Sequence, residues 1–273
     1  MSNLNFKGRN IYYDVQGEGK PILILNGIMM STKSWEPFVK SFTHNNQLIR
    51  LDFIDQGQSD KLENSEYTQS IQVDIIECLV KELKLQKVSI VGISYGGEVA
   101  ILFAAKNPNM VDRLVLLNTT PYTSPWLAEI GHSWNRIGRT RDGQTYYQAT
   151  IPVIYSPSYY QKRLDWMKNR EKLLVPIFSN ATFLDAMERL TNSAESFDAR
   201  NVLDQISAPT LIVAADEDFL TPLQNQKELK EKIKNSEIVI LPGVGHASMY
   251  ERPLLFVTLV LGFINALETS FQI

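Results

Sequence analysis

Short apolar runs alternate with longer amphipathic segments along most of the chain. The runs are rich in β-branched residues, as buried strands are, and we expect strands at residues 11–15, 22–25, 48–52, 87–91, 114–117, 211–215 and 237–241. Helical spacing of apolar residues predicts helices at 35–42, 68–83, 98–105 and 254–267, with Thr68 as the N-cap of the second. This alternation predicts an α/β fold with a mainly parallel sheet, helices on both faces, and the functional site at the carboxyl ends of the strands.

Ser94 lies between an expected strand and an expected helix, in the sequence Gly92-Ile93-Ser94-Tyr95-Gly96. A turn this tight places unusual backbone angles on its central residue and brings neighbouring backbones together, which explains a glycine two residues before and two residues after the serine. The helix behind Ser94 directs free N–H groups toward the same point, where they stabilise negative charge on a substrate oxygen. The pattern predicts a nucleophile, and a serine in a glycine-rich turn is the alternative.

A serine nucleophile needs a base within hydrogen-bond reach and a third group that orients the base. The chain has three histidines. His44 lies in a polar stretch and His132 in a basic segment, and either fits an ordinary surface position. His246 instead follows the expected strand 237–241 and a glycine-containing turn that can carry its side chain over the strand ends, so we expect it to be the base.

The order of the nucleophile Ser94, the acid Asp218 and the base His246, each directly behind an expected strand, resembles the α/β-hydrolase superfamily. The resemblance runs from about residue 10 to the C-terminus, apart from the interval 122–205, and is nearest to single-domain bacterial esterases, enol-lactonases and C–C hydrolases. It implies that Ser94 attacks a carbonyl carbon, that His246 takes and returns the proton, and that water resolves the acyl-enzyme.

The strand 211–215 leads into two candidate acids, Asp216 and Asp218. In the superfamily the acid is usually the third residue after the small residue that ends this strand, with a Thr-Pro pair shortly after it. Asp218 fits that position, and Asp216 is then expected to face solvent or to hold the loop. Some relatives place the acid behind the preceding core strand, but this chain has Asn118 there and offers no carboxylate.

Two backbone N–H groups are expected to form the oxyanion hole. One belongs to Tyr95, next to the nucleophile, and the other to Ile28, in the loop after strand 22–25. Relatives often carry histidine in that loop where this chain has Asn26, so the hydrogen bonds that hold the loop are expected to differ. Met29 and Met30 follow, and we expect them to pack in the core or to line an apolar acyl pocket.

Residues 52–59 match a second signature of the superfamily, Asp-x-x-Gly-x-Gly-x-Ser, with Asp55 in place of the first glycine. The replacement predicts a turn that differs in detail from the turn of the relatives. We expect this segment to fix a loop beside the site rather than to take part in catalysis.

The interval 122–205 contains no expected strand, and the resemblance implies that it forms a helical lid inserted into a core of residues 1–121 and 206–273. It holds 12 of the 27 aromatic residues of the chain. This enrichment favours an apolar substrate pocket, although helix packing explains aromatic side chains equally well. Trp126 and Trp134 are the candidates for contact with substrate.

Arg136, Arg139 and Arg141 form a basic cluster in the lid segment, with no acid from residue 131 to residue 141. Such a run is usually a solvated face. The alternative is a grip on a substrate carboxylate or on an acidic carrier protein.

Composition and charge narrow the classes of partner. The chain has 273 residues and is 44% hydrophobic, which is enough for one large α/β domain with an inserted lid. A net charge of −3 and a pI of about 5.7 do not favour a nucleic-acid or membrane-surface partner.

The single cysteine, Cys78, excludes an intrachain disulfide. Residues 1–7 lack the apolar region of a signal peptide and residues 254–267 are too short to span a bilayer, so a cytoplasmic location is expected.

Together these features predict a serine hydrolase that needs no cofactor or metal and cleaves a carboxylic ester, lactone or thioester. C–C bond hydrolysis, acyl transfer and cofactor-free perhydrolysis use the same triad and remain alternatives. A receptor for a small molecule is a further alternative, since related folds with an intact triad serve as receptors in which binding and lid closure matter more than turnover.

Overall fold

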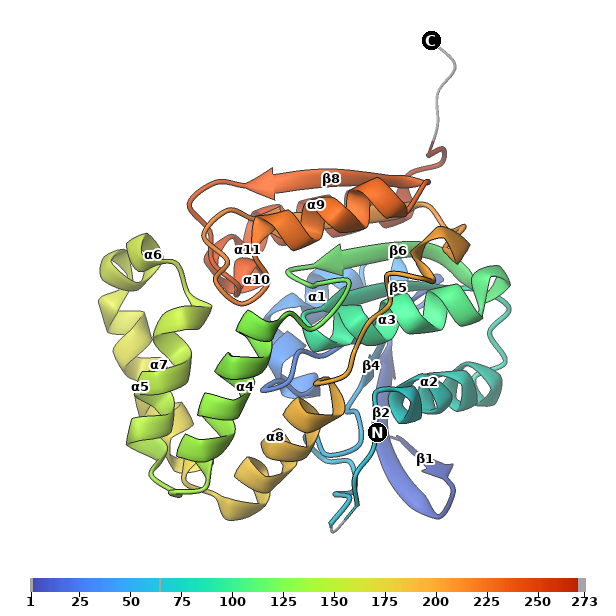
Figure 1. Cartoon of the computed structure of the whole chain (residues 1–273). Helices are drawn as coiled ribbons and strands as arrows, with labels where there is room; N and C mark the ends of the chain where they lie inside the picture. The colour runs from blue at the N-terminus through green and yellow to red at the C-terminus, as the bar shows by residue number, and fades with distance from the viewer. Residues whose placement is uncertain (1, 64, 270–273) are drawn as a thin grey trace.

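A sheet of eight strands runs through the described part of the chain, residues 2–63 and 65–269 of the computed structural model (Figure 1). Its strand order is β1-β2-β4-β3-β5-β6-β7-β8. The pairs β1–β2 and β2–β4 are antiparallel, and every other neighbouring pair is parallel, which confirms the predicted mainly parallel sheet. The strands are β1 (Ser2–Phe6), β2 (Arg9–Gln16), β3 (Lys20–Leu25), β4 (Asn46–Leu51), β5 (Val88–Ile93), β6 (Val111–Leu117), β7 (Thr210–Ala215) and β8 (Ser236–Leu241).

Strand β1 is an addition to the predicted set. Only Leu4 and Phe6 of its five residues are buried, so the strand carries little of the apolar signal that predicts a strand. It pairs with β2 through a tight turn at Lys7-Gly8, where both residues have positive φ (51° and 81°). Two consecutive residues with positive φ match the twist of a two-residue hairpin, and glycine adopts that angle without strain.

Helices cover both faces of the sheet, as predicted. The central strand β5 shows the alternation: Val88 and Ile90 belong to the apolar core beneath α2, α3 and α9, whereas Val91 and Ile93 belong to the core beneath η1, α1 and α11. These helices are η1 (Thr32–Phe38), α1 (Val39–Phe42), α2 (Ser70–Glu82), α3 (Tyr95–Lys106), α9 (Leu223–Lys232) and α11 (Pro253–Asn265).

Two helix predictions need correction. The helix expected at 35–42 is a 3-10 segment, η1, followed by the short α1, since Pro37 removes a backbone donor from the middle of the segment. The prediction that Thr68 caps the next helix is wrong. Gln69 is the N-cap of α2, and the Thr68 hydroxyl bonds to the Ser70 hydroxyl, while its backbone carbonyl accepts the N–H of Ile71.

Five further helices lie between β6 and β7 in the chain. Figure 1 shows them grouped beyond the ends toward which the arrows of β6 and β8 point, so they face the carboxyl ends of the parallel strands. They share an aromatic core of their own, which includes Tyr146, Tyr147, Tyr155 and Phe178. Much of the aromatic enrichment of the segment therefore serves helix packing. The helices are α4 (Pro125–Gly138), α5 (Gly143–Ile154), α6 (Pro157–Lys162), α7 (Leu164–Phe178) and α8 (Ala181–Ser193).

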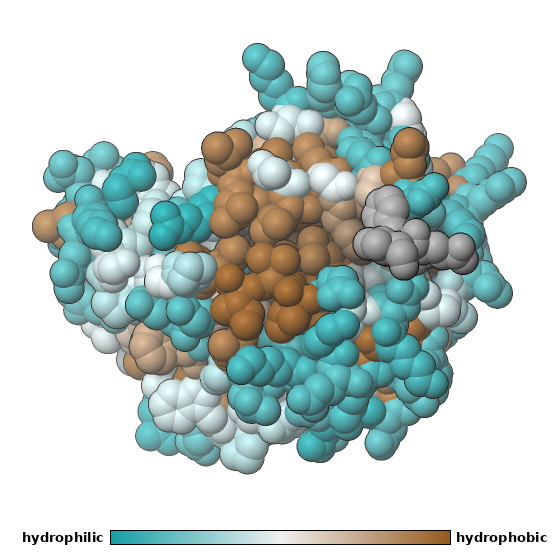
Figure 2. Space-filling model, turned by 90° about the horizontal axis from the view of Figure 1, so that it is seen from above, coloured by the Kyte–Doolittle hydropathy of each residue, from teal (hydrophilic) through white to brown (hydrophobic). Residues whose placement is uncertain are grey.

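The last helix, α11, packs on the sheet through Phe256, Val260 and Ile264, as the sequence predicts. It is apolar on its other sides too, and Leu254 is 79% exposed. Figure 2 shows the resulting apolar area on the face of the molecule that carries β8 and α11. Among the described helices, none combines the length and the apolar character that crossing a membrane would require.

Asp55 ties the loop after β4 to helix α8. Its φ is +70°, an angle that is rare for a residue with a side chain and explains why relatives carry glycine here. The fully buried carboxylate accepts two hydrogen bonds from Arg189 of α8, at 2.6 and 3.0 Å. It also accepts the Tyr67 hydroxyl and the N–H of Leu62. The aspartate thus joins the core to the inserted helices, in agreement with the structural role expected of residues 52–59.

We expect Arg189→Met to lower the free energy of unfolding by about 3 kcal/mol, because it leaves the buried Asp55 carboxylate without its cation. The double variant Asp55→Asn/Arg189→Met should recover most of that loss, since asparagine tolerates positive φ and carries no charge. Urea denaturation of the three chains measures the effect. A double variant less stable than Arg189→Met would contradict the assignment of the cost to an unpaired charge.

Candidate active site

Ser94 occupies the sharp turn between β5 and α3, with φ 53° and ψ −125°. A non-glycine residue holds such angles only where its surroundings impose them, and such strain gathers at functional sites. The flanking glycines have a direct cause. A Cβ on Gly92 would lie 2.5 Å from the Gly96 carbonyl oxygen, and a Cβ on Gly96 would lie 2.4 Å from that of Leu25. The Ser94 N–H donates to Leu117 and its carbonyl accepts the Thr119 hydroxyl, which anchors the turn on both sides.

His246 and Asp218 form a buried pair. The imidazole Nδ1 lies 2.9 and 3.0 Å from the two carboxylate oxygens. Burial alone would raise the pKa of the Asp218 carboxyl. The charge and hydrogen bond of His246, with hydrogen bonds from Thr221 and Asn118, instead hold that pKa below its usual value. The carboxylate is therefore ionised at neutral pH and can orient the imidazole and stabilise its protonated form.

The structure separates the two candidate acids of the sequence. Asp216 accepts the N–H of Gly243 at 2.7 Å and so holds the turn that precedes the histidine. Asp218 lies beside the imidazole and is held by the backbone N–H groups of Leu220 and Thr221, both at 2.9 Å. The order of the sequence motif, with the acid in third place behind β7, therefore matches the geometry.

Asn118 supports the acid from the end of β6. Its amide nitrogen donates to the Asp218 carboxylate at 2.9 Å, and its amide oxygen accepts the Ser248 hydroxyl. From the sequence, Asn118 is notable only because some relatives carry the catalytic acid at its position. Its role as a hydrogen-bond donor to an acid on the next strand depends on the parallel pairing of β6 with β7, which brings the two strand ends together.

Asn26 holds the loop after β3 in place of the histidine of many relatives. It is fully buried, donates to the Leu51 carbonyl and the Gln56 side chain, and accepts the indole N–H of Trp35 at 2.7 Å. Gln56 in turn donates to the Gly27 and Ile28 carbonyls. The carbonyls of the loop are thus fixed from the second signature segment. No motif in the sequence links Gln56 to Asn26, because the two residues are 30 positions apart.

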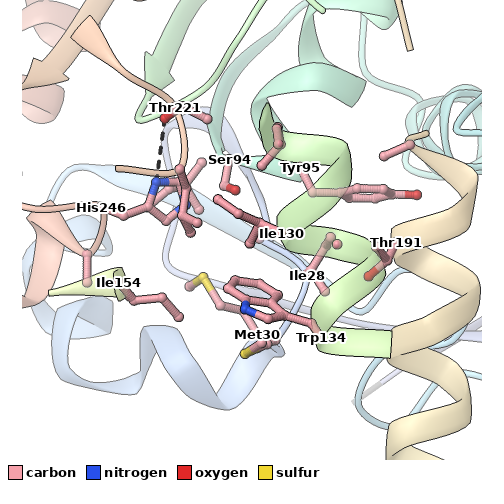
Figure 3. A pocket seen from close by; sticks show the side chains of 18 of the residues that line it. Ile28, Met30, Ser94, Tyr95, Ile130, Trp134, Ile154, Thr191, Thr221 and His246 are labelled. Carbon is pink, nitrogen blue, oxygen red and sulfur yellow. Dashed lines mark hydrogen bonds between the residues drawn. The ribbon is translucent and has the colours of Figure 1, made fainter. Parts of the chain in front are cut away.

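A cavity of about 160 Å³ opens at the nucleophile. Ser94 and His246 lie on its wall, together with Ile28, Met29 and Tyr95. Figure 3 shows these two polar side chains at one side, with Ile130 and Trp134 reaching in from α4. Tyr95 is the first residue of α3, so its N–H is one of the donors that the helix leaves unpaired.

Ser94 and His246 face the same cavity. In the described structure the Ser94 hydroxyl and the His246 imidazole form no direct hydrogen bond. The Nδ1 side of the imidazole is engaged by Asp218, and Thr221 lies 3.5 Å from the same nitrogen (Figure 3). The hydrogen bond between a catalytic serine and its base is often long without substrate and shortens in the reacting complex.

Trp126 does not line this cavity, which corrects its selection as a substrate contact. It lies in the first turn of α4, is 59% exposed, and donates its indole N–H to the Phe219 carbonyl at 3.0 Å. Trp134, two turns further along the same helix, does reach the cavity. Trp126 instead lies at the N-terminal end of α4, against the loop that carries Phe219.

The basic cluster at the C-terminal end of α4 also lies away from the cavity. Arg139 pairs with Glu188 and Arg141 pairs with Asp185, and both acids lie on α8. Arg136 is exposed. Two of the three charges are therefore compensated locally, which favours the solvated-face interpretation over a grip on substrate.

Glu98 is a buried carboxyl group on the cavity wall, one turn into α3. Burial raises the pKa of Glu98 to about 7, although a hydrogen bond from Gln69 and the charge of His246 favour its ionised form. Nothing in the sequence distinguishes Glu98 from a surface residue, since glutamate in a helix is usually exposed.

The raised pKa of Glu98 makes the stability of the protein depend on pH. The unfolded chain loses this proton near the ordinary glutamate value and the folded chain near pH 7, so the free energy of unfolding should fall as pH rises between these values. Glu98→Gln should remove this dependence and gain about 3 kcal/mol relative to the natural chain between pH 5 and pH 8. Urea denaturation at several pH values tests it; parallel curves for the two chains would refute it.

Comparisons with known proteins agree with this geometry. Residues 20–253 match the family described as alpha/beta hydrolase fold. The solved structure of MGS-M2, an alpha/beta hydrolase enzyme from a Medee basin deep-sea metagenome library, is 49% identical over the full length of both chains, with a TM-score of 0.98. A Bacillus subtilis protein provisionally named 2-succinyl-6-hydroxy-2,4-cyclohexadiene-1-carboxylate synthase is 29% identical, over 94% of this chain and 96% of the relative.

The fold extends to more distant enzymes. The enol-lactonase from Burkholderia xenovorans LB400 has a TM-score of 0.85 at 19% identity, over 97% of this chain and all of the other. At that identity the likeness concerns the fold alone. The family match spans most of the chain, and MGS-M2 is described as an alpha/beta hydrolase enzyme. This chain belongs to the alpha/beta hydrolase fold family and is an enzyme of that family.

Proposed function

We propose that this protein is a serine hydrolase that cleaves a carboxylic ester, lactone or thioester through an acyl-enzyme. The observation that carries the proposal is the position of Ser94. It is held at strained angles on the wall of an apolar cavity that also receives the imidazole of the His246–Asp218 pair. This combination supplies a nucleophile, a base and a carboxylate that orients the base, all at one place.

In the proposed reaction the Ser94 hydroxyl attacks the substrate carbonyl while His246 accepts its proton. Asp218 stabilises the imidazolium that forms, and the N–H groups of Ile28 and Tyr95 donate to the oxyanion. The imidazolium then protonates the leaving group, which departs as an alcohol or a thiol or, in a lactone, remains attached to the acyl group as a hydroxyl or an enol. A water molecule, deprotonated by His246, attacks the acyl-enzyme and releases the acid.

The cavity favours a small, mostly apolar acyl group. Its volume of about 160 Å³ is close to that of engineered apolar cavities that hold a benzene ring. Met29, Trp134, Ile151 and Ile154 line the cavity. Of the substrate contacts expected from the sequence, Met29 and Trp134 therefore remain the proposed ones. We propose that residues 122–205 act as a lid that excludes water from the site, above a core formed by residues 1–121 and 206–273.

The alternatives use the same groups in different ways. C–C hydrolysis, acyl transfer and perhydrolysis differ from ester hydrolysis in the leaving group or in the acceptor of the acyl group. Solved structures with this fold include an esterase from Exiguobacterium antarcticum and a meta-cleavage product hydrolase from Pseudomonas fluorescens IP01, so the fold by itself does not choose between these reactions.

A substrate panel tests the proposal. It contains p-nitrophenyl esters, lactones, acyl thioesters and vinylogous diketones, each assayed with the natural chain and with Ser94→Ala. Hydrolysis of at least one ester, lactone or thioester that disappears in Ser94→Ala supports the proposal. Turnover of the diketones alone would replace it by C–C hydrolysis. Tight binding of a small molecule without any turnover would replace it by a receptor.

A further inference from the structure

Arg170 of α7 lies where the catalytic cavity meets a wide outer groove. It lines both the cavity at Ser94 and a groove of about 1400 Å³ between the inserted helices and η1, α10 (Ser248–Glu251) and α11. Leu174 and Tyr250 also line both. A group bound by Arg170 can therefore belong to a molecule whose other end lies in the catalytic cavity.

Aromatic rings hold the Arg170 side chain in place. The guanidinium carbon lies 4.9 Å from the ring centre of Tyr250, 5.3 Å from that of Trp166 and 6.0 Å from that of Tyr155. A guanidinium stacks well on such faces, and a side chain fixed in this way loses little further entropy when it binds a ligand. Tyr155 also contacts the His246 loop, because a Cβ on Gly245 would lie 2.8 Å from the Tyr155 carbonyl carbon.

Arg170 has no carboxylate partner among the described residues, unlike Arg139, Arg141 and Arg189 of the same inserted helices. Its Nε is buried and has no hydrogen-bond acceptor in the described part of the protein. Aromatic faces attract the positive charge but accept no strong hydrogen bond. A buried donor without an acceptor costs free energy, so this arrangement favours an acceptor that arrives with a ligand.

The nearby acids are engaged elsewhere. Glu251, in the same groove, accepts the Ser156 N–H and hydroxyl and the Gly245 N–H. Glu195, on the cavity wall, bonds to His132. Glu98, also on that wall, accepts a hydrogen bond from Gln69. None of them neutralises the guanidinium in the described structure.

We propose that Arg170 binds a carboxylate carried by the substrate, at the end remote from the carbonyl that Ser94 attacks. This inference rests on the proposed serine hydrolase function and narrows its substrate class to esters, lactones or thioesters with a free carboxylate. The guanidinium presents paired N–H donors that match the two oxygens of a carboxylate. The apolar side chains Ile154, Leu174 and Phe178 on the cavity wall fit a hydrocarbon spacer between the two ends. Arg170 is thus a specificity-determining residue.

Matched substrates test the proposal. Mono-p-nitrophenyl esters of glutaric, adipic and suberic acid carry a terminal carboxylate where the p-nitrophenyl esters of the corresponding monocarboxylic acids carry a methyl group. For at least one length, kcat/KM of the natural chain should be higher for the charged ester. Arg170→Met should raise KM for that ester by about 10- to 100-fold with little change in kcat, and should alter the neutral ester by less than about threefold.

Two further variants identify the source of the effect. Arg170→Lys keeps the charge without the paired donors and should retain only part of the preference. Arg163→Met removes another arginine of the outer groove, one that stacks on Tyr159 and does not line the catalytic cavity, and it should leave both esters unchanged. Equal losses for charged and neutral esters in Arg170→Met would show that the residue only packs, and no preference at any length in the natural chain would overturn the proposal.

Measuring binding in a variant that cannot turn substrate over tests the role of Arg170 independently of the proposed hydrolase function. In Ser94→Ala, calorimetry with the monomethyl esters of the three diacids should give a dissociation constant that rises about 10-fold or more when Arg170→Met is added. If the natural chain hydrolyses the neutral esters but shows no preference for the charged esters at any length, the role of Arg170 alone is refuted. Absence of hydrolysis of every ester, lactone and thioester by the natural chain would refute the proposed function, while the calorimetric comparison would still decide whether Arg170 binds the carboxylate.

Discussion

Ser94→Ala is expected to abolish labelling by a fluorophosphonate probe and to lower kcat/KM by about 10⁶-fold, the order found when a triad serine is removed. The hydroxyl at the turn between β5 and α3 is the only atom of that residue that can form the acyl-enzyme. Alanine keeps the backbone and the cavity, so the loss should not come from unfolding. Mass spectrometry of the labelled natural chain should place the adduct on Ser94.

Ser89→Ala is the matched control for this experiment. Ser89 is a buried serine of β5, the strand that leads into the turn at Ser94, and its hydroxyl has no hydrogen-bond partner in the described part of the chain. Its removal should therefore change neither labelling nor turnover. An adduct on any other residue, with Ser94 unmodified, would remove the basis of the proposed mechanism.

The fold and the central site residues could be predicted because their signals are local. A buried parallel strand reads as a continuous apolar run, and the turn at Ser94 requires glycines at fixed offsets whatever the rest of the protein does. The acid and the histidine follow β7 and β8 directly, so their common location at the sheet edge follows from the topology. The short polar strand β1 has no comparable signal.

The supporting residues could not be predicted because their partners are distant in sequence. Asn26 is held by Trp35, Leu51 and Gln56, and these contacts exist only once β3 and β4 pair. In the same way, the sequence presents Arg139 as part of a basic cluster. Its charge is compensated by Glu188, which lies on another helix 49 residues away.

Arg170 is the opposite of Arg139: it is inconspicuous in the sequence but distinctive in the structure. Nothing in its local sequence distinguishes it from the other arginines of residues 122–205, and its importance comes from what surrounds it in space. The aromatic residues that hold it come from α7, α10 and the connection between α5 and α6. Specificity in this family is therefore harder to predict than chemistry, since the inserted helices determine the pocket by packing rather than by a motif.

Asp218→Asn is expected to lower kcat by about 10⁴-fold, the loss measured for the equivalent change in a well-studied serine protease triad. The carboxylate accepts hydrogen bonds from His246, from Asn118 and from two backbone N–H groups. An amide in its place turns one acceptor into a donor, which cannot face these groups without breaking a bond, and it no longer stabilises the imidazolium. Asp216→Asn, in contrast, keeps an acceptor for the Gly243 N–H and should be nearly silent.

Steady-state kinetics on one ester, with thermal unfolding of each variant, separates the effect on catalysis from any effect on folding. Asp218→Asn should lower kcat far more than it raises KM, because the imidazolium forms only after substrate has bound. The reverse ranking, with Asp216→Asn inactive and Asp218→Asn active, would transfer the role of acid to Asp216. Equal and small losses in both would mean that His246 works without an oriented carboxylate, a result that the buried 2.9 Å contact between the imidazole and Asp218 leads us to reject.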